Sequence, residues 1–198
     1  MKIYKIGIIG CGGIAQKMAA TLEKMKGVER YAVASRNQEK AEAFANKWGF
    51  TKAYGSYEEL ASDPEVDLIY IATPHAMHYD NAHMCIEKGK PVLCEKAFTA
   101  NARQAEDLLA FAKEKGVFIT EAIWTRYMPL SLKIQELLKE GVIGTPYTLS
   151  ANLSYPISNK ERIIRPELAG GALLDIGVYT LNFAAMAFGS DIAETHSV

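Results

Sequence analysis

The chain has 198 residues, more than one typical domain and fewer than two large ones. Its hydrophobic content of 49% is enough to form a buried core, which excludes an intrinsically disordered chain. The formal net charge of −1 and the lack of a basic stripe argue against nucleic acid or an anionic membrane as a partner.

Two further observations limit the classes of protein that need considering. No apolar run reaches the roughly 18 residues of a membrane span, so no membrane partner is expected. The three cysteines, Cys11, Cys85 and Cys94, are odd in number and show no C-x-x-C spacing. This pattern argues against a disulfide framework or a metal site and predicts a cytoplasmic protein.

Short apolar runs alternate with amphipathic segments over the first 122 residues. Ile14, Met18, Leu22 and Met25, for example, lie on one face of a helix that follows the first run. Repeated strand–helix alternation predicts an α/β fold with a doubly wound parallel sheet. The expected strands are Ile3–Ile9, Tyr31–Ala34, Leu68–Ala72, Pro91–Cys94 and Val117–Thr120.

The pattern changes near residue 123, so we expect a first domain at 1–122 and a second at 123–198. The second domain begins with a helix around residues 130–138, closed by Gly141 and Gly144. Apolar residues then alternate with polar ones over 147–155, which predicts a strand with one buried face. An apolar helix follows at 172–188. One strand and two helices cannot close a sheet, so we expect an incomplete α+β domain.

The first strand runs into a glycine-rich turn, Gly10-Cys11-Gly12-Gly13-Ile14-Ala15, which reads G-x-G-x-x-A. The motif is weak alone, but here it follows a strand and opens a helix, as the dinucleotide-binding fingerprint requires. The glycines allow a tight turn and close approach of a pyrophosphate to the backbone and the helix N-terminus. An ordinary glycine turn is the alternative. The context favours a Rossmann nucleotide site.

The residues after the second strand indicate which nucleotide binds. An NAD site has Asp or Glu about 20 residues after the glycine turn, to hold the ribose 2′-hydroxyl. This chain has Ser35-Arg36 there instead. A hydroxyl and a guanidinium suit a 2′-phosphate, so we expect NADP, with NAD as the second choice. The alternative is that Ser35 caps the next helix and Arg36 is solvated.

Ligands of doubly wound sheets bind beyond the carboxyl ends of the strands, and two further motifs lie there. Thr73-Pro74-His75, with His78, follows the third predicted strand, and Glu95-Lys96 follows the fourth. These positions place Lys96 where a nicotinamide ring could lie. A surface lysine and a helix-surface histidine are the alternatives.

The late helix, 172–188, is apolar almost all round, which predicts burial. Asp175, Tyr179 and Asn182 nevertheless lie on one stripe of it, where they need partners or a cleft. They form either a structural polar network or a proton-transfer site with Lys96 opposite. A nearby cation would stabilise a tyrosinate and make Tyr179 a usable acid or base.

Three motifs together resemble the Gfo/Idh/MocA oxidoreductases: the GCGGIA turn, Glu95-Lys96 after a strand, and GGALLDIGVY at 170–179. The stretches 121–129 and 95–108 are most similar to the branch with dimeric dihydrodiol dehydrogenase and NADP-dependent D-xylose dehydrogenase. The resemblance covers essentially the whole chain. It implies reversible hydride transfer between NADP and a CH–OH carbon of a sugar, polyol or trans-dihydrodiol.

The resemblance also implies residue roles. Lys96, Asp175 and Tyr179 would be catalytic, with Tyr179 moving the hydroxyl proton, Lys96 lowering its pKa and Asp175 orienting the pair. Trp124, Arg126, Tyr127 and Tyr179 would line the substrate pocket. His78 and Thr73 would lie near the nicotinamide ribose. The cofactor-binding set implied by motif and resemblance is Gly10, Gly12, Gly13, Ile14, Ala15, Ser35, Arg36, Thr73, Pro74, His78, Glu95 and Lys96.

The chain departs from the family pattern in two ways. Ala97 stands where the family has proline. Family members also have a broad second-domain sheet, much of which would lie beyond residue 198. An incomplete sheet would leave Tyr147, Leu149 and Leu153 uncovered, so we expect a homo-oligomer formed through this sheet. Two alternatives to an active enzyme are a nucleotide-sensing regulatory relative and a truncated product that binds cofactor without activity.

Overall fold

The chain folds into two units in the structure, a computed structural model that describes residues 2–157 and 159–196. The first unit comprises Met1–Ala122 with Glu167–Ala169, and the second comprises Ile123–Pro166 with Gly170–Val198. Each unit has its own set of elements, and each is described by itself.

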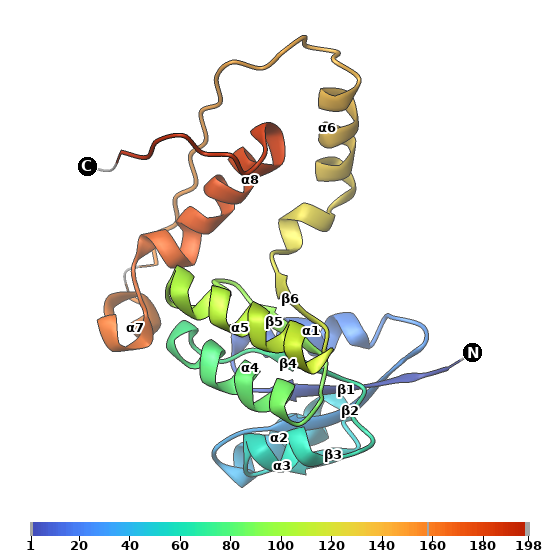
Figure 1. The fold of residues 1–198 in the computed structure, drawn as a ribbon. Helices are drawn as coiled ribbons and strands as arrows, with labels where there is room; N and C mark the ends of the chain where they lie inside the picture. The colour runs from blue at the N-terminus through green and yellow to red at the C-terminus, as the bar shows by residue number, and fades with distance from the viewer. Residues whose placement is uncertain (1, 158, 197–198) are drawn as a thin grey trace. The chain divides into compact units, whose positions relative to one another are not determined.

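A six-stranded sheet forms the centre of the first unit, in the order β3-β2-β1-β4-β5-β6, with every pair parallel (Figure 1). The order reverses between β1 and β4, so the predicted doubly wound parallel sheet is confirmed. The strands are β1 (Tyr4–Ile9), β2 (Val28–Ala34), β3 (Lys52–Tyr54), β4 (Leu68–Ile71), β5 (Val92–Glu95) and β6 (Ile119–Ala122).

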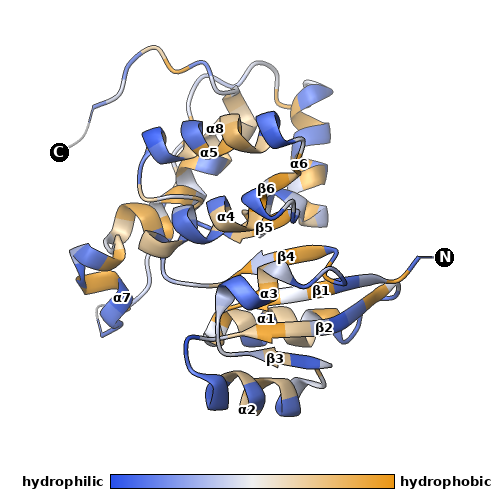
Figure 2. Ribbon diagram, turned by 60° about the horizontal axis from the view of Figure 1, so that its bottom comes forward, coloured by the Kyte–Doolittle hydropathy of each residue, from blue (hydrophilic) through white to orange (hydrophobic). Residues whose placement is uncertain are grey.

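Helices cover both faces of this sheet. Residues of α1 (Gly13–Leu22) and α2 (Gln38–Trp48) share one buried cluster with the sheet. Residues of α3 (Tyr57–Ser62), α4 (His78–Glu87) and α5 (Ala102–Lys115) share the other. Hydrophobic and hydrophilic residues alternate along α2 in Figure 2, as expected for a helix with one face on a core.

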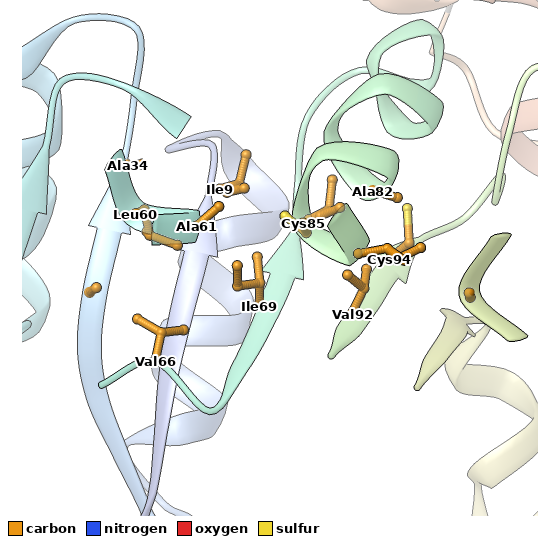
Figure 3. Close-up of a cluster of buried hydrophobic side chains, with 14 of the residues drawn as sticks. Ile9, Ala34, Leu60, Ala61, Val66, Ile69, Ala82, Cys85, Val92 and Cys94 are labelled. Atoms are coloured by element: carbon orange, nitrogen blue, oxygen red, sulfur yellow. The ribbon is translucent and has the colours of Figure 1, made fainter. Parts of the chain in front are cut away.

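Successive residues of the central strands point into opposite cores. Ile69, Val92 and Cys94 pack with Leu60 of α3 and Cys85 of α4 (Figure 3). Their strand neighbours Tyr70 and Leu93 pack against the opposite cluster. A parallel sheet covered on both faces needs near-continuous apolar strands, which explains why these runs do not alternate with polar residues.

The second unit consists of short helices joined by irregular chain. Its elements are η2 (Trp124–Tyr127), α6 (Pro129–Lys139), α7 (Glu161–Ile164), a π-helical turn η4 (Leu173–Gly177) and α8 (Val178–Phe188). Two further 3₁₀ turns, η1 (His75–Met77) and η3 (Pro166–Leu168), belong wholly or mostly to the first unit. The helices predicted at 130–138 and 172–188 are confirmed.

Two expectations for the second unit are wrong. Residues 147–155 form no strand, and Tyr147 is 90% exposed. A period-two pattern marks which side chains would be buried, but a strand also needs a hydrogen-bonded neighbour, and the described residues of this unit supply none. The late helix is not buried either. Between residues 172 and 188 only Asp175 is buried, because α8 packs mainly against η4, η2 and α6.

The expectation that no segment could span a membrane also needs correction. One helical stretch of the described chain, Pro166–Phe188, is long and apolar enough to do so by length and composition alone. The same stretch contains Asp175, which is ion-paired, and Tyr179 and Asn182, which accept hydrogen bonds from η2. Such polar contacts are typical of a helix packed within a protein domain.

Candidate active site

The residues predicted to bind the cofactor lie at the carboxyl edge of the sheet in the first unit. β1 pairs with β4, and β4 pairs with β5, so the segments that follow these three strands emerge side by side. These segments carry the glycine turn, Thr73-Pro74 and Glu95-Lys96. Ser35 and Arg36 follow β2, the neighbour of β1 on its other side.

The glycine turn has the geometry of an anion site. Gly10 has a φ of +99°, and a Cβ there would lie 2.8 Å from the carbonyl oxygen of Ala72. Gly12 is the N-cap of α1. A Cβ on Gly12 or Gly13 would meet no atom within 4 Å, so the backbone is open to a ligand here. Ala15 is fully buried against the sheet. An open turn, with the unpaired amides of a helix N-terminus, fits a pyrophosphate.

The segment after β2 carries the buried Ser35, whose hydroxyl accepts a 3.4 Å hydrogen bond from the Asn37 amide. Ser35 does not cap α2, because the cap is Asn37, whose side chain accepts a 2.8 Å hydrogen bond from the Lys40 amide. The side chain of Arg36 is exposed. Burial raises the pKa of Tyr57, and the charge of Arg36 opposes that rise, so the guanidinium lies close to this phenol. The N-cap of α2 is thus Asn37 and not Ser35, whereas the other part of that alternative, an exposed Arg36, agrees with the structure.

His78 is fully buried and is not a surface histidine. Its Nδ1 lies 2.7 Å from the carbonyl oxygen of Ala97, and its Nε2 lies 2.8 Å from that of Thr73. The ring thus links the segments that follow β5 and β4. Burial lowers the pKa of His78, although the two carbonyl groups oppose this effect. Both ring nitrogens of His78 are directed at protein oxygens and not at a ribose. The side chain therefore holds together the two segments that follow β4 and β5.

The neighbouring residues of this edge are also held in place. The Thr73 hydroxyl accepts a 3.1 Å hydrogen bond from the Asn81 side chain. Pro74 is the N-cap of η1, and Nδ1 of the buried His75 lies 3.1 Å from the carbonyl oxygen of Ala169. These contacts fix the Thr73-Pro74 turn from both sides.

Glu95 is a buried acid whose partner the sequence did not reveal. The Tyr70 hydroxyl of β4 donates a hydrogen bond to it, and the Lys96 amide lies 3.3 Å from its other oxygen. Burial raises the pKa of Glu95, and the Tyr70 hydroxyl and Lys96 oppose that rise. Glu121 was also missed, and its carboxylate accepts a 2.9 Å hydrogen bond from the Phe98 amide. These contacts anchor the segment that begins at the end of β5 to β4 and β6.

The second unit carries Tyr179 on α8, where two residues of η2 contact the helix. The Trp124 Nε1 donates a 3.1 Å hydrogen bond to the Tyr179 hydroxyl, and the Arg126 Nε donates a 2.8 Å bond to the Asn182 side chain. Beside them lies a cavity of about 240 Å³. Its lining residues are Thr125, Arg126, Met128, Leu130, Ser131, Ile134, Tyr179, Asn182, Phe183 and Met186.

Asp175 is buried and forms an ion pair with Arg162 of α7. It lies in the π-helical turn η4, which changes the angular spacing that a regular helix would give. Asp175 therefore has a partner on α7, whereas Tyr179 and Asn182 have theirs on η2. The shared polar stripe of Asp175, Tyr179 and Asn182 stays a prediction.

The predicted site residues thus fall into two groups. The cofactor-binding set and Lys96 lie in the first unit, and Asp175, Tyr179, Trp124 and Arg126 lie in the second. The joint action of Lys96 with Tyr179 stays a prediction, as does a substrate role for the exposed Tyr127. Within residues 2–157 and 159–196, no three His, Cys, Asp or Glu side chains gather to hold a metal ion.

Comparison with protein families gives two matches. Residues 4–122 match the oxidoreductase family with an NAD-binding Rossmann fold, and residues 131–198 match the GFO/IDH/MocA C-terminal domain. The chain belongs to the Gfo/Idh/MocA oxidoreductase family.

Two curated relatives in this family are similar to the chain over most of its length. D-xylose 1-dehydrogenase (NADP(+)) of Hypocrea jecorina is 44% identical and is aligned with 90% of this chain and 51% of its own length. Human trans-1,2-dihydrobenzene-1,2-diol dehydrogenase is 39% identical, with 97% of this chain and 58% of the relative covered. The chain thus spans about half the length of these Gfo/Idh/MocA relatives.

Solved structures of other oxidoreductases are similar to this chain in fold. An NAD binding oxidoreductase from Klebsiella pneumoniae has a TM-score of 0.81 at 31% identity, covering 94% of this chain and 53% of that one. KijD10, a 3-ketoreductase from Actinomadura kijaniata in complex with NADP and TDP-benzene, has a TM-score of 0.81 at 31% identity, covering 95% and 58%.

The open glycine turn generates a first prediction. Gly12→Ala should fold normally but bind NADPH about 5- to 150-fold more weakly, because the added methyl fills space that a pyrophosphate needs. Gly10→Ala should instead lower the free energy of unfolding, because its φ is positive and the Ala72 carbonyl is close. Fluorescence titration and urea unfolding separate the two effects. Native NADPH affinity in the Gly12 variant would contradict the site.

His78 generates a second prediction. Its folded-state pKa lies below the unfolded value of about 6.5, so the unfolded chain binds the proton more readily. Stability should therefore fall as pH falls through that value, and His78→Gln should remove part of the fall. The same substitution at the half-buried His83 of α4 is the matched control. Urea unfolding at about pH 7.5 and pH 5.5 measures both. Equal falls in the two variants would count against His78.

Proposed function

We propose that this chain binds NADP and takes part in reversible hydride transfer between its nicotinamide and a CH–OH carbon of a sugar, polyol or trans-dihydrodiol. The observation that carries the proposal is the open glycine turn beside Ser35 and Arg36, at the carboxyl edge of a doubly wound sheet. The name of the Hypocrea jecorina relative supports NADP and a sugar substrate, and the name of the human relative supports a trans-dihydrodiol.

The proposal assigns separate residues to cofactor binding, proton transfer and substrate binding. The glycine turn and the N-terminus of α1 hold the pyrophosphate, and Ser35 and Arg36 hold the 2′-phosphate. Thr73, Pro74 and Glu95 shape the edge beside them. When bound, the nicotinamide supplies or accepts the hydride. Tyr179 moves the hydroxyl proton, Lys96 stabilises the phenolate, and Asp175 orients the pair. Arg126 and Tyr179 line the cavity that we propose receives part of the substrate.

Association of several copies is also part of the proposal. The second unit exposes Tyr147, Val142 and Ile143, which are 90%, 64% and 71% accessible. No strand forms at 147–155, so the proposed association uses exposed apolar side chains instead of the expected sheet.

Cofactor choice is the prediction that tests Ser35 and Arg36. NADPH should bind more tightly than NADH, and Arg36→Ala should weaken NADPH binding roughly ten- to hundredfold while changing NADH binding little, because only NADPH has the 2′-phosphate. Lys113→Ala, at the far end of α5, removes an equal charge as a control. Fluorescence titration measures each affinity. Equal losses for both nucleotides would contradict the assignment.

The catalytic role is tested by Lys96→Met. Turnover of D-xylose or a trans-dihydrodiol should fall by about two to four orders of magnitude, because the cation that stabilises the phenolate is lost, while NADPH binding survives. Steady-state kinetics and the same titration measure both. Retained turnover would contradict the role of Lys96. Saturable NADPH binding without turnover in the native chain would contradict catalysis by this chain.

A further inference from the structure

Two consecutive contacts join η2 to one face of α8. Trp124 and Arg126 lie two residues apart on η2, and their partners Tyr179 and Asn182 lie three apart on α8. Residues three apart share one helix face, so the two bonds act side by side. The indole and phenol rings also pack edge to face, with centroids 6.2 Å apart and an interplanar angle of 71°. The Tyr179 side chain is therefore held by a ring contact with Trp124 as well as by the hydrogen bond from its indole.

The chemistry of the indole fixes the direction of the first bond. A tryptophan side chain has one N–H group and no acceptor, so the oxygen of Tyr179 must accept this bond. A hydrogen bond donated to a phenol oxygen is stronger when that oxygen is ionised, so it favours the phenolate. The contact thus affects both the position of the oxygen and the ease with which it loses its proton.

We propose that Trp124 is a positioning residue for Tyr179: its indole N–H fixes the phenol oxygen and stabilises the phenolate. The proposal rests on the proposed function, in which Tyr179 transfers the proton. It gives Trp124 a role different from contact with substrate. The bond between Arg126 and Asn182 supports the same arrangement one turn further along α8.

Other charged groups on the packed elements must be considered in a test that depends on pH. Arg126 of η2 binds Asn182, and Asp175 of η4 is paired with Arg162. On α6, Lys133 and Glu136 pair with each other 2.9 Å apart, and the residues of α6 that line the cavity beside Tyr179 are uncharged. None of these groups changes when Trp124 is substituted. Lys96, which the proposed function assigns to the phenolate, is removed by Lys96→Met in a parallel fluorescence experiment, so that a step remaining below pH 10 reports the indole contact.

The first experiment needs neither substrate nor cofactor. The chain has two tryptophans, Trp48 and Trp124, so Trp48→Phe leaves Trp124 as the sole indole emitter. A tyrosinate at the distance of Tyr179 quenches that emission by energy transfer. Emission should fall in a step below pH 10, the usual tyrosine value, and Tyr179→Phe in the same background should abolish the step. A step at or above pH 10, or one that survives Tyr179→Phe, would overturn the proposal.

The second experiment measures catalysis. Trp124→Phe keeps a ring but removes the donor, so kcat should fall roughly fivefold, the effect of one neutral hydrogen bond, with KM unchanged. The pH at which kcat rises should move upward. Trp124→His, which retains a ring N–H, should restore part of the loss.

Trp48→Phe is the matched control for this substitution. Its indole donates a 3.3 Å bond to Gln16 in the first unit, so kcat and the pH profile should be unchanged. A raised KM with native kcat in Trp124→Phe would overturn the proposal and assign Trp124 to substrate contact. If the native chain shows no turnover, the proposed function fails separately. The fluorescence step in the Lys96→Met background then decides the role of Trp124: a step below pH 10 supports it, and a step at or above pH 10 overturns it.

Discussion

Every strand of the sheet runs in the same direction, and the proposed cofactor site depends on this constraint. Parallel strands end at one edge, so residues far apart in sequence, such as Gly10, Ser35 and Lys96, follow β1, β2 and β5 there. The crossover helices that make parallel pairing possible also cover both faces of the sheet. The strand interiors are therefore committed to packing, and the segments that follow them carry the polar groups.

Much of this first unit could be predicted from the sequence because its signals are local. The glycine turn was informative only because an apolar run preceded it and an amphipathic helix followed. The bond between Tyr70 and Glu95 could not be predicted, since Tyr70 belongs to the run Leu-Ile-Tyr-Ile, which looks like ordinary strand core. The role of His78 was missed for another reason. Its two carbonyl partners lie in different segments, and nothing in the local sequence around His78 points to them.

The second unit was harder to predict because its contacts join distant positions. The alternation at 147–155 marks a face but not the neighbouring strand that the face requires. The apolar character of 172–188 indicates burial only if enough elements pack around it, and those described here leave it half-exposed. The motif around Asp175 and Tyr179 was visible. Arg162 lies 13 residues from its partner Asp175, and Trp124 lies 55 residues from its partner Tyr179. No spacing in the sequence links either partner to the motif.

The pairing of Arg162 with Asp175 has a consequence for redesign of this protein. A buried carboxylate that loses its cation is left uncompensated, which costs more than the pair contributes. Arg162 lies on α7, beside the irregular chain that links α6 to η4. A graft that replaces this connecting segment with one from a relative would therefore also exchange the counterion of Asp175. The segment and the helix that follows it form one transferable module, and crossover points in chimeras belong outside both.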